Sequence, residues 1–293
     1  MAEPTDPWNT PAFLRDVQYR TDANLAARQS IYAYQRPRLD LQARVIDLAA
    51  PAPGATVADV GCGNGAYLAE LAGRGLAGRV LGLDMSLGML AAARDRLTSS
   101  GSSTESGAAG AAAPTETSGP SKSPADVALI AADATALPLP DGVADLTLAM
   151  HMLYHVPDPS QAVRELRRVT RPGGRVVIGL NGRDHLRQLR DAVHAARADG
   201  VMRSQRERVT LDDAEALTEP YFSTVTRHDF VSELRLPDPG PIMEYVRSMS
   251  GTQHAADPDR LAAAVASSFP TGPDTVITII THTGCLICDV PAR

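Results

Sequence analysis

One short stretch, residues 57–65, constrains the fold of this chain more than any other. It reads Val-Ala-Asp-Val-Gly-Cys-Gly-Asn-Gly, an apolar run that breaks into glycines at alternate positions, and a helix-forming run follows over 66–72. This pattern is typical of a buried strand that turns sharply into a helix. Glycine suits such a turn because a Cβ would block close approach of a ligand and because tight turns often require positive φ. We therefore expect a ligand to bind against bare backbone at this turn.

Strand and helix patterns alternate around the turn. Strand patterns lie at 56–60, 79–83, 127–131, 144–149 and 175–180, and helical patterns lie at 65–73, 86–97, 160–170 and 184–198. Short strands that are apolar throughout and separated by helices indicate a parallel sheet covered on both faces.

The strict alternation stops after residue 200. A short helical pattern at 211–217 precedes a strand-like run at 222–236, and the last run, 275–290, is dense in valine, isoleucine and threonine. A strand of this kind at the end of a chain usually pairs into the sheet. The helical patterns between these two strands, within 237–272, are therefore expected to form an inserted cap over the carboxyl edge of the sheet.

These patterns divide the chain into three expected parts. Helical spacing over 22–48, interrupted at Pro37, predicts two N-terminal helices. Residues 98–125 consist mostly of Ser, Gly, Ala, Thr and Pro with little to bury, so we expect a flexible surface insertion there. The expected parts are N-terminal helices at 1–50, a ligand-binding core at 51–200 that contains the insertion, and final strands with the cap at 201–293.

Composition and charge exclude several classes of protein. The 293 residues are 44% hydrophobic and 21% charged, as in ordinary globular domains. No apolar run approaches the roughly 18 residues of a membrane span, and the N-terminus lacks a signal-peptide pattern, so we expect a cytoplasmic protein with no membrane partner. A net charge of −6 argues against a nucleic-acid partner. Arg203, Arg206 and Arg208 have acidic neighbours and are interpreted as a solvated face.

Lysine and cysteine are scarce. Lys122, the only lysine, lies in the low-complexity segment, which nearly excludes Schiff-base or P-loop chemistry. Cys62, Cys285 and Cys288 are too few for a disulfide framework or a four-cysteine zinc site, and no metal is expected. Cys285 and Cys288 lie three apart in a β-branched run and point to opposite faces of a strand. We interpret them as core residues ahead of a redox pair.

The glycine turn matches a permissive dinucleotide pattern, which alone is a weak signal. Gly61, Gly63 and Ala66 satisfy G-x-G-x-x-A, and Asp84 lies where an acidic residue would bind ribose hydroxyls. However, nothing basic near the turn offers partners for two phosphates.

Two further residues favour a nucleoside with a cationic tail. Asp59, at a strand end two residues before the first glycine, would repel a pyrophosphate and attract an ammonium group. Gly65 extends the motif to D-x-G-x-G-x-G. These features favour S-adenosylmethionine over a nicotinamide or flavin cofactor.

Four stretches of the chain form an ordered set. They are the glycine motif at 57–65, Val-Leu-Gly-Leu-Asp-Met-Ser at 80–86, Ala-Asp-Ala at 132–134 with Leu-Pro-Leu-Pro-Asp-Gly at 137–142, and Leu-Arg-Arg-Val-Thr-Arg-Pro-Gly-Gly-Arg at 166–175. With them, residues 57–180 resemble class I S-adenosylmethionine-dependent methyltransferases, particularly the small-molecule branch that includes quinone-biosynthesis enzymes. The resemblance implies a Rossmann-like, doubly wound α/β sheet of seven strands with a reversed last strand, an N-terminal helical lid, and a helical cap between the last two strands. The insertion at 98–125 departs from the family pattern and is interpreted as tolerated.

The resemblance also implies roles in binding the cofactor. Asp84 would accept hydrogen bonds from both ribose hydroxyls. The adenine would lie against Met85, Asp133 and the Ala134 amide, and Asp59 would meet the amino-acid tail. In the lid, Tyr19 and Arg20 would reach the cofactor carboxylate. Arg28 is a less favoured substitute for Arg20, and a solvated helix surface is the alternative for both arginines. The expected cofactor-binding residues are Tyr19, Arg20, Asp59, Gly61, Cys62, Gly63, Asp84, Met85, Asp133, Ala134 and Met150. For each acidic residue the alternative is a helix N-cap or a solvated strand end.

On the acceptor side, Met-His-Met-Leu-Tyr-His-Val-Pro-Asp at 150–158 resembles the family pattern S-N-x-L-H-H-V-P-D. The resemblance places His151 at the position that faces the methyl group, as an acceptor contact or catalytic general base. A hydrogen-bonded structural histidine is an equal alternative. His155 is interpreted as structural, whereas Asn181 and His185 are candidates for lining the acceptor pocket, with an ordinary turn as the alternative.

The family's Asn/Asp-Pro-Pro-Tyr/Phe motif for amide or exocyclic amine acceptors is absent here. We therefore predict an enzyme that moves a methyl group from S-adenosylmethionine to O, N or C of a small-molecule metabolite. The alternatives are a cofactor-binding enzyme of another type, such as a cyclase or decarboxylase, a non-catalytic cofactor-binding partner protein, and, remotely, a nicotinamide oxidoreductase. The identity of the acceptor and a homodimeric state stay open.

Overall fold

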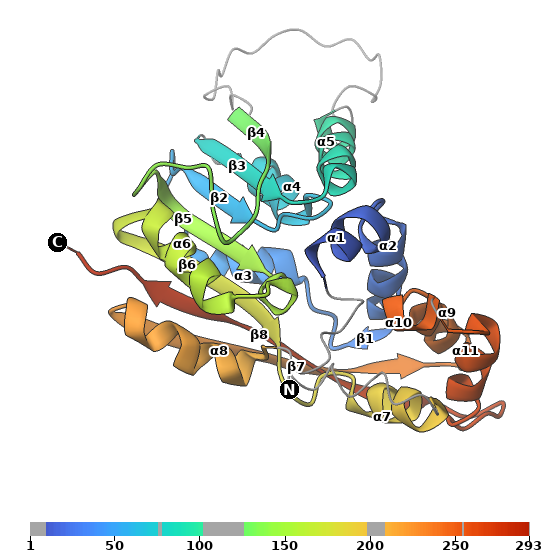
Figure 1. Ribbon diagram of the computed structural model, residues 1–293. Helices are drawn as coiled ribbons and strands as arrows, with labels where there is room; N and C mark the ends of the chain where they lie inside the picture. Colours follow the sequence, from blue (N-terminus) through green and yellow to red (C-terminus); the bar gives the residue numbers. More distant parts are fainter. Residues whose placement is uncertain (1–9, 76–77, 102–125, 198–208, 254, 293) are drawn as a thin grey trace, which may run out of the picture.

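The computed structural model describes residues 10–75, 78–101, 126–197, 209–253 and 255–292, and within them an eight-stranded sheet (Figure 1). The strands are β1 (Gln35–Arg36), β2 (Val57–Val60), β3 (Arg79–Asp84), β4 (Asp126–Ala131), β5 (Ala144–Met150), β6 (Thr170–Asn181), β7 (Thr224–Leu236) and β8 (Ile277–Asp289). They lie in the order β1-β7-β8-β6-β5-β2-β3-β4. Strands β2 to β6 pair in parallel, whereas β8 runs antiparallel to both β6 and β7. The predicted Rossmann-like sheet with a reversed last strand is confirmed.

Helices cover both faces of the sheet. The longer ones are α2 (Ala23–Ser30), α3 (Leu41–Ala49), α4 (Ala66–Gly73), α5 (Leu87–Gly101), α6 (Pro159–Val169), α7 (Arg187–Ala196), α8 (Leu211–Thr218), α9 (Gly240–Arg247) and α11 (Pro258–Ala266). Shorter ones are α1 (Pro11–Phe13), η2 (Leu14–Gln18), η3 (Ile31–Tyr34), η5 (Leu153–His155), η7 (Glu219–Tyr221) and α10 (Ser250–Gln253). Helices α3, α4 and α5 pack in one apolar cluster, and α6 and α8 pack in another on the opposite face. Helical spacing explains the packing of α6, where Ala162, Leu166 and Val169 are fully buried on one side.

The strand order reverses at β2. Strand β2 pairs with β3 on one side and with β5 on the other, so the helices that follow β2 and β5 diverge to opposite faces. In open α/β sheets, ligands bind in the crevice outside the carboxyl ends of the strands at such a point. The sheet therefore places the glycine turn, which directly follows β2, at the expected binding position.

A third apolar cluster lies at the other end of β7 and β8. It includes side chains of η3, α7, α9 and α11 packed on the strands. Helices α9 to α11 occupy the chain between β7 and β8, where inserted helices were expected, and α9 contacts α2 (Figure 1). The N-terminal helices and the inserted helices thus meet, while their roles as lid and cap stay predictions.

Two sequence predictions were wrong in detail. The described residues form eight strands, because β1 pairs antiparallel with Glu233 and Leu234 of β7 within a region predicted to be helical. The Gln35 side chain donates to the Ser232 hydroxyl at 2.6 Å, so contacts distant in sequence override the local helical pattern. Helix α5 extends to Gly101, four residues into the predicted insertion; residues 102–125, with Lys122, lie outside the described residues, as do Arg203, Arg206 and Arg208.

The two C-terminal cysteines occupy opposite faces of β8, as predicted. Cys285 packs in the cluster of α3, α4 and α5, and Cys288 packs in the cluster of α6 and α8. Both thiols are free and buried, and burial raises the pKa of each to about 12. These residues therefore belong to the core, and neither is poised for thiolate chemistry.

Candidate cofactor and acceptor site

A cavity of about 800 Å³ lies at the carboxyl edge of the sheet. Its walls include the ends of β2, β3, β5 and β6, the segment after β4, and side chains of α2, η3, η5 and α9. Of the predicted site residues, the cavity wall contains Tyr19, Asp59, Gly61, Cys62, Gly63, Asp84, Met85, Asp133, Ala134, Met150 and His151. Arg20 is exposed and is not part of the wall, whereas Arg28 is. The structure therefore brings together nearly the whole predicted set.

The glycine turn presents backbone to the cavity. Gly61, Gly63 and Gly65 have φ values of 72°, 53° and 75°, which other residues adopt only with strain. A Cβ on Gly61 would lie 2.6 Å from Cβ of Met152, and one on Gly65 would lie 2.9 Å from Cβ of Ala93. At Gly63 the nearest atom would be 3.8 Å away. Close packing thus requires the outer two glycines, while the middle one leaves space above its backbone.

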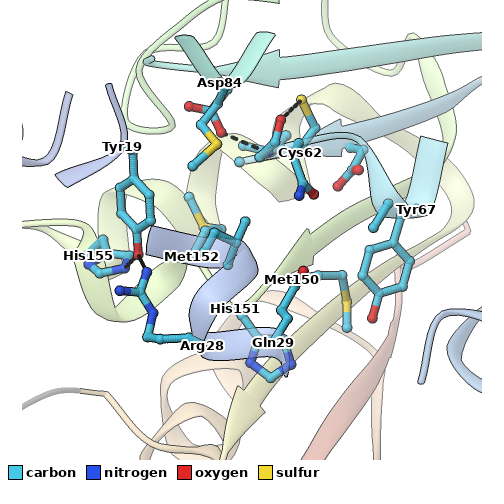
Figure 2. Close-up of a pocket in the computed structure, with 18 of the residues that line it drawn as sticks. Tyr19, Arg28, Gln29, Cys62, Tyr67, Asp84, Met150, His151, Met152 and His155 are labelled. Carbon is cyan, nitrogen blue, oxygen red and sulfur yellow. Dashed lines mark hydrogen bonds between the residues drawn. The ribbon is translucent and has the colours of Figure 1, made fainter. Parts of the chain in front are cut away.

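Asp84 ends β3 and anchors the glycine turn. Its carboxylate accepts a hydrogen bond from the backbone N–H of Gly63 at 2.9 Å (Figure 2). It also accepts one from the backbone N–H of Ser86 at 2.8 Å. Burial raises the pKa of Asp84, and the backbone donors oppose that shift. A carboxylate has about four lone-pair sites, so Asp84 keeps acceptor capacity toward the cavity after making both bonds.

Asp59 is a buried carboxyl group without a partner. Asp59 is only 1% exposed, and neither oxygen of its carboxyl group makes a hydrogen bond within the part of the chain that the structure describes. Burial raises the pKa of Asp59 to about 7, with a smaller contribution from the nearby Asp84 carboxylate. Such a group is costly to bury unless a ligand satisfies it, and a cationic hydrogen-bond donor in the cavity would do so.

The residues that the resemblance assigns to the adenine also lie on the wall. The Asp133 carboxylate is exposed and accepts hydrogen bonds from the Thr135 amide at 2.8 Å and the Thr135 hydroxyl at 2.7 Å. This local turn matches the alternative considered for Asp133, although the residue still borders the cavity. Ala134 and Cys62 are buried, and burial raises the pKa of the Cys62 thiol far above its usual range.

His151 directly follows β5 in the left-handed region. Its φ is 55°, and its backbone N–H donates to the Gly179 carbonyl at 2.8 Å. Among the described residues, none hydrogen-bonds to the His151 ring, which argues against the structural alternative. Burial lowers the pKa of His151 to about 4. The ring is therefore neutral near pH 7 and keeps an unprotonated nitrogen in the cavity wall.

Tyr19, Arg28 and His155 form a cluster that joins the N-terminal segment to the core. The Tyr19 hydroxyl lies 2.9 Å from Nε2 of His155 and accepts from Nη2 of Arg28 at 3.3 Å (Figure 2). Arg28 also donates to the Ser248 carbonyl at 2.9 Å, and Tyr19 accepts through its own carbonyl from the Ser86 hydroxyl at 2.6 Å. His155 is thus a wall residue held by a distant tyrosine.

Sequence reasoning assigned no site role to the wall residues Leu25, Gln29 and Tyr32 of the N-terminal helices, and it gave Arg28 only as a less favoured substitute for Arg20. Leu25, Arg28, Gln29 and Tyr32 all line the cavity, at the i, i+3, i+4 and i+7 spacing of one helical face. This periodicity was a signal that the face packs inward, but the sequence alone does not say against what. Tyr154 and Tyr245, from η5 and α9, complete an aromatic wall on this side.

The fold and the cavity define the class of this protein as a doubly wound α/β protein with a nucleoside-type site beside a glycine turn. Residues 58–178 match the model of the methyltransferase domain family. An uncharacterised methyltransferase of Mycobacterium tuberculosis is 32% identical over 210 residues, which cover 71% of this chain and 70% of that protein. The chain therefore belongs to the class I S-adenosylmethionine-dependent methyltransferases, and S-adenosylmethionine is its expected cofactor.

Two further proteins are similar to this chain, one in sequence and one in fold. The ubiquinone biosynthesis O-methyltransferase of Thiobacillus denitrificans is 34% identical over 144 residues, 49% of this chain and 52% of that protein. The chain thus spans only about half the length of this relative. The solved structure of the cyclase SpnF shares the fold, with a TM-score of 0.56 and 18% identity over 97% of both chains.

Within the described ranges, no helix is long and apolar enough to cross a membrane. The same residues contain no group of three or more His, Cys, Asp or Glu side chains arranged to hold a metal ion.

Proposed function

We propose that this protein transfers a methyl group from S-adenosylmethionine to an O, N or C atom of a small molecule. The observation that carries the proposal is the partnerless, buried carboxyl group of Asp59 beside the open backbone of Gly63, in one cavity with Asp84. The family and the printed names of the quinone-biosynthesis relatives support a small-molecule acceptor.

The residues of the cavity fit this cofactor. Asp59 would hold the ammonium group of the amino-acid tail, which supplies the missing partner. Asp84 would use its remaining lone pairs for the ribose hydroxyls, and Met85 and Ala134 would border the adenine. When bound, S-adenosylmethionine supplies a methyl group on a sulfonium centre with a good leaving group. Most of the protein's task is then to align the acceptor and exclude water.

His151 is the group proposed to take a proton from the acceptor. A neutral imidazole without a hydrogen-bond partner can accept a proton from an acceptor hydroxyl as the new bond forms. The low pKa of His151 makes it a weak base, so it suits an acceptor that loses its proton during transfer, when the acidity of that proton rises. An acceptor that arrives ionised would not need it.

Binding of S-adenosylhomocysteine tests the cofactor proposal directly. Calorimetry should detect saturable binding by the folded chain, and Asp84→Ala should weaken it. Transfer of a labelled methyl group to a small acceptor then tests the reaction. Folded protein with no detectable binding would end the proposal.

A second function deserves the same assay because a cyclase shares the fold. In this alternative the cofactor is bound but its methyl group is not transferred. Turnover of a substrate with no label in any product would favour it.

A further inference from the structure

Tyr32 and His185 form a hydrogen-bonded pair in the cavity wall, outside the set of residues expected from the sequence to bind the cofactor. The Tyr32 hydroxyl lies 2.9 Å from Nε2 of His185, and the two rings stack with centroids 6.3 Å apart and an interplanar angle of 22°. Tyr32 comes from η3, and His185 comes from the segment between β6 and α7. Both residues line the same cavity as His151.

The other nitrogen of His185 fixes the direction of this hydrogen bond. The backbone N–H of His282 donates to Nδ1 of His185 at 3.2 Å, so Nδ1 must carry a lone pair. Burial lowers the pKa of His185 to about 3, so the ring is neutral at physiological pH. A neutral imidazole carries one N–H. That hydrogen is therefore on Nε2, and His185 donates to the oxygen of Tyr32.

The hydroxyl hydrogen of Tyr32 is consequently free to donate to another group. No acceptor for it is found among the described residues, although the hydroxyl group sits in a cavity wall. Burial also raises the pKa of Tyr32 well above its usual value, so the hydroxyl keeps its hydrogen. Tyr32 is thus a hydrogen-bond donor whose direction is set by His185.

We propose that Tyr32, held in place by His185, donates a hydrogen bond to an oxygen atom of the methyl acceptor. The inference rests on the proposed function and narrows its substrate class to acceptors with a hydroxyl, enol or phenolate oxygen. Tyr32 would contact the acceptor, and His185 would act as a positioning residue.

The charges around Tyr32 support an oxygen over an ammonium group. Besides the neutral His185, its ionisable neighbours are Tyr154, Tyr245 and Arg28. None of the described wall residues from α2, η3, η5 and α9 is acidic, whereas the carboxylates of the wall come from the residue before α3, from α4, β2 and β3, and from the segment after β4. This side of the cavity therefore offers donors and a positive charge, which favour a neutral or anionic oxygen.

Binding of 4-nitrocatechol to the full chain saturated with S-adenosylhomocysteine tests the proposal. This probe is a phenol whose ionised form absorbs visible light, so one titration reports both affinity and ionisation. We expect Tyr32→Phe to weaken its binding about tenfold. We also expect the bound probe to ionise at a higher pH in that variant, because the lost donor stabilises the anion. A merely structural role would not move this ionisation.

Three controls make the test specific. Tyr34→Phe changes a tyrosine of the same helix that does not line the cavity, and it should leave binding unchanged. His185→Gln keeps an N–H donor and should retain most of the affinity that His185→Phe loses. The matched diamine probe, 4-nitro-1,2-phenylenediamine, lacks the phenolic oxygens and should bind more weakly than 4-nitrocatechol.

The outcomes separate this inference from the proposed function. Equal affinity and equal probe ionisation in Tyr32→Phe and the unsubstituted chain would overturn the inference, as would preference for the diamine. Binding of S-adenosylhomocysteine without binding of 4-nitrocatechol would overturn it alone. Failure of folded protein to bind S-adenosylhomocysteine would overturn the proposed function and this inference with it.

Discussion

The two halves of the cavity are lined by different kinds of chemical group. The cofactor half, in which we propose that S-adenosylmethionine binds, consists of the glycine turn and the carboxyl ends of β2, β3 and β4, all within residues 59–134. Backbone conformation and carboxylates dominate it. The acceptor half is made of side chains whose partners are far apart in the chain: Arg28 and Ser248 are 220 positions apart, and Tyr32 and His185 are 153 apart.

This difference explains why one half is recognisable and the other is not. In the cofactor half, positive φ values and Cβ distances below 3 Å leave little choice of residue, so the constraint appears as a local motif. In the acceptor half, many combinations of tyrosine, histidine and arginine would satisfy the same geometry. If the division is functional, substitutions in each half should affect different measurements.

The largest effect is expected for His151→Asn, at the border of the two halves. We expect kcat for labelled methyl transfer to catechol to fall by about a hundredfold or more, because general-base catalysis typically contributes that much. Asparagine tolerates the left-handed φ of this position better than most residues. Since the pKa of His151 is lowered to about 4, no rate change from its titration is expected between pH 6 and 8. Affinity for S-adenosylhomocysteine should not change, and an unaltered kcat would remove His151 from catalysis.

Asp84→Ala should give the largest loss in cofactor affinity. We expect S-adenosylhomocysteine to bind roughly a hundredfold more weakly, because the variant loses charge-assisted bonds to the ligand and the acceptor of the Gly63 and Ser86 amides. Calorimetry measures the change. An Asp84→Ala protein that binds normally would show that the cofactor half is not organised around this carboxylate.

The sequence predicted the sheet and the cofactor half for physical reasons that are local. Apolar strands, an alternating glycine motif and acidic strand ends are each recognisable as a sequence pattern of a few residues. The short edge strand β1 has no such local pattern, because the pairing of Gln35 and Arg36 with β7 depends on residues about 200 positions away. The sequence also did not show which of two neighbouring residues would face the cavity: Tyr19 lines it, whereas Arg20 is exposed.

The acceptor half was only partly predictable. His151 was identified as a candidate because residues 150–158 resemble the family pattern, and His185 because it follows a strand pattern at the carboxyl edge that the strands share. The pairing of His185 with Tyr32, and that of His155 with Tyr19, depends on how the N-terminal helices fold back over that edge. Helical spacing indicated an inward face but not its partner.

Asp59→Asn should have a moderate effect with a pH signature. Because the pKa of Asp59 is raised to about 7, its carboxyl group is mainly protonated below that pH and pairs poorly with an ammonium group. We expect affinity for S-adenosylhomocysteine to rise between pH 6 and 8 in the unsubstituted chain. Asp59→Asn should lack this rise and bind about tenfold more weakly at pH 8.

The same substitution should act oppositely on the stability of the ligand-free protein. A carboxyl group whose folded-state pKa lies above its unfolded value is stabilising when protonated, and that stability is lost as the pH rises from about 4 to about 7. Asp59→Asn avoids burying the charge, so we expect a higher unfolding temperature than that of the unsubstituted chain at pH 8. A lower unfolding temperature at pH 8 would show that the Asp59 carboxylate is satisfied without ligand.

The smallest effect is expected for Asp133→Ala, the acidic partner that the motif places on the adenine. Its carboxylate is exposed and already bonded to Thr135, whereas Asp84 is half-buried and accepts hydrogen bonds from the backbone of the glycine turn. Removing an exposed, locally satisfied group exchanges its two hydrogen bonds from Thr135 for bonds to water, so affinity for S-adenosylhomocysteine should fall less than about threefold. Thr135→Ala, which frees the carboxylate from its local bond to the threonine hydroxyl, is the matched control and should not weaken binding. A loss of affinity near that of Asp84→Ala would mean that the Asp133 side chain turns toward the ligand. The sequence motif would then describe the ligand-bound state better than the local turn with Thr135 does.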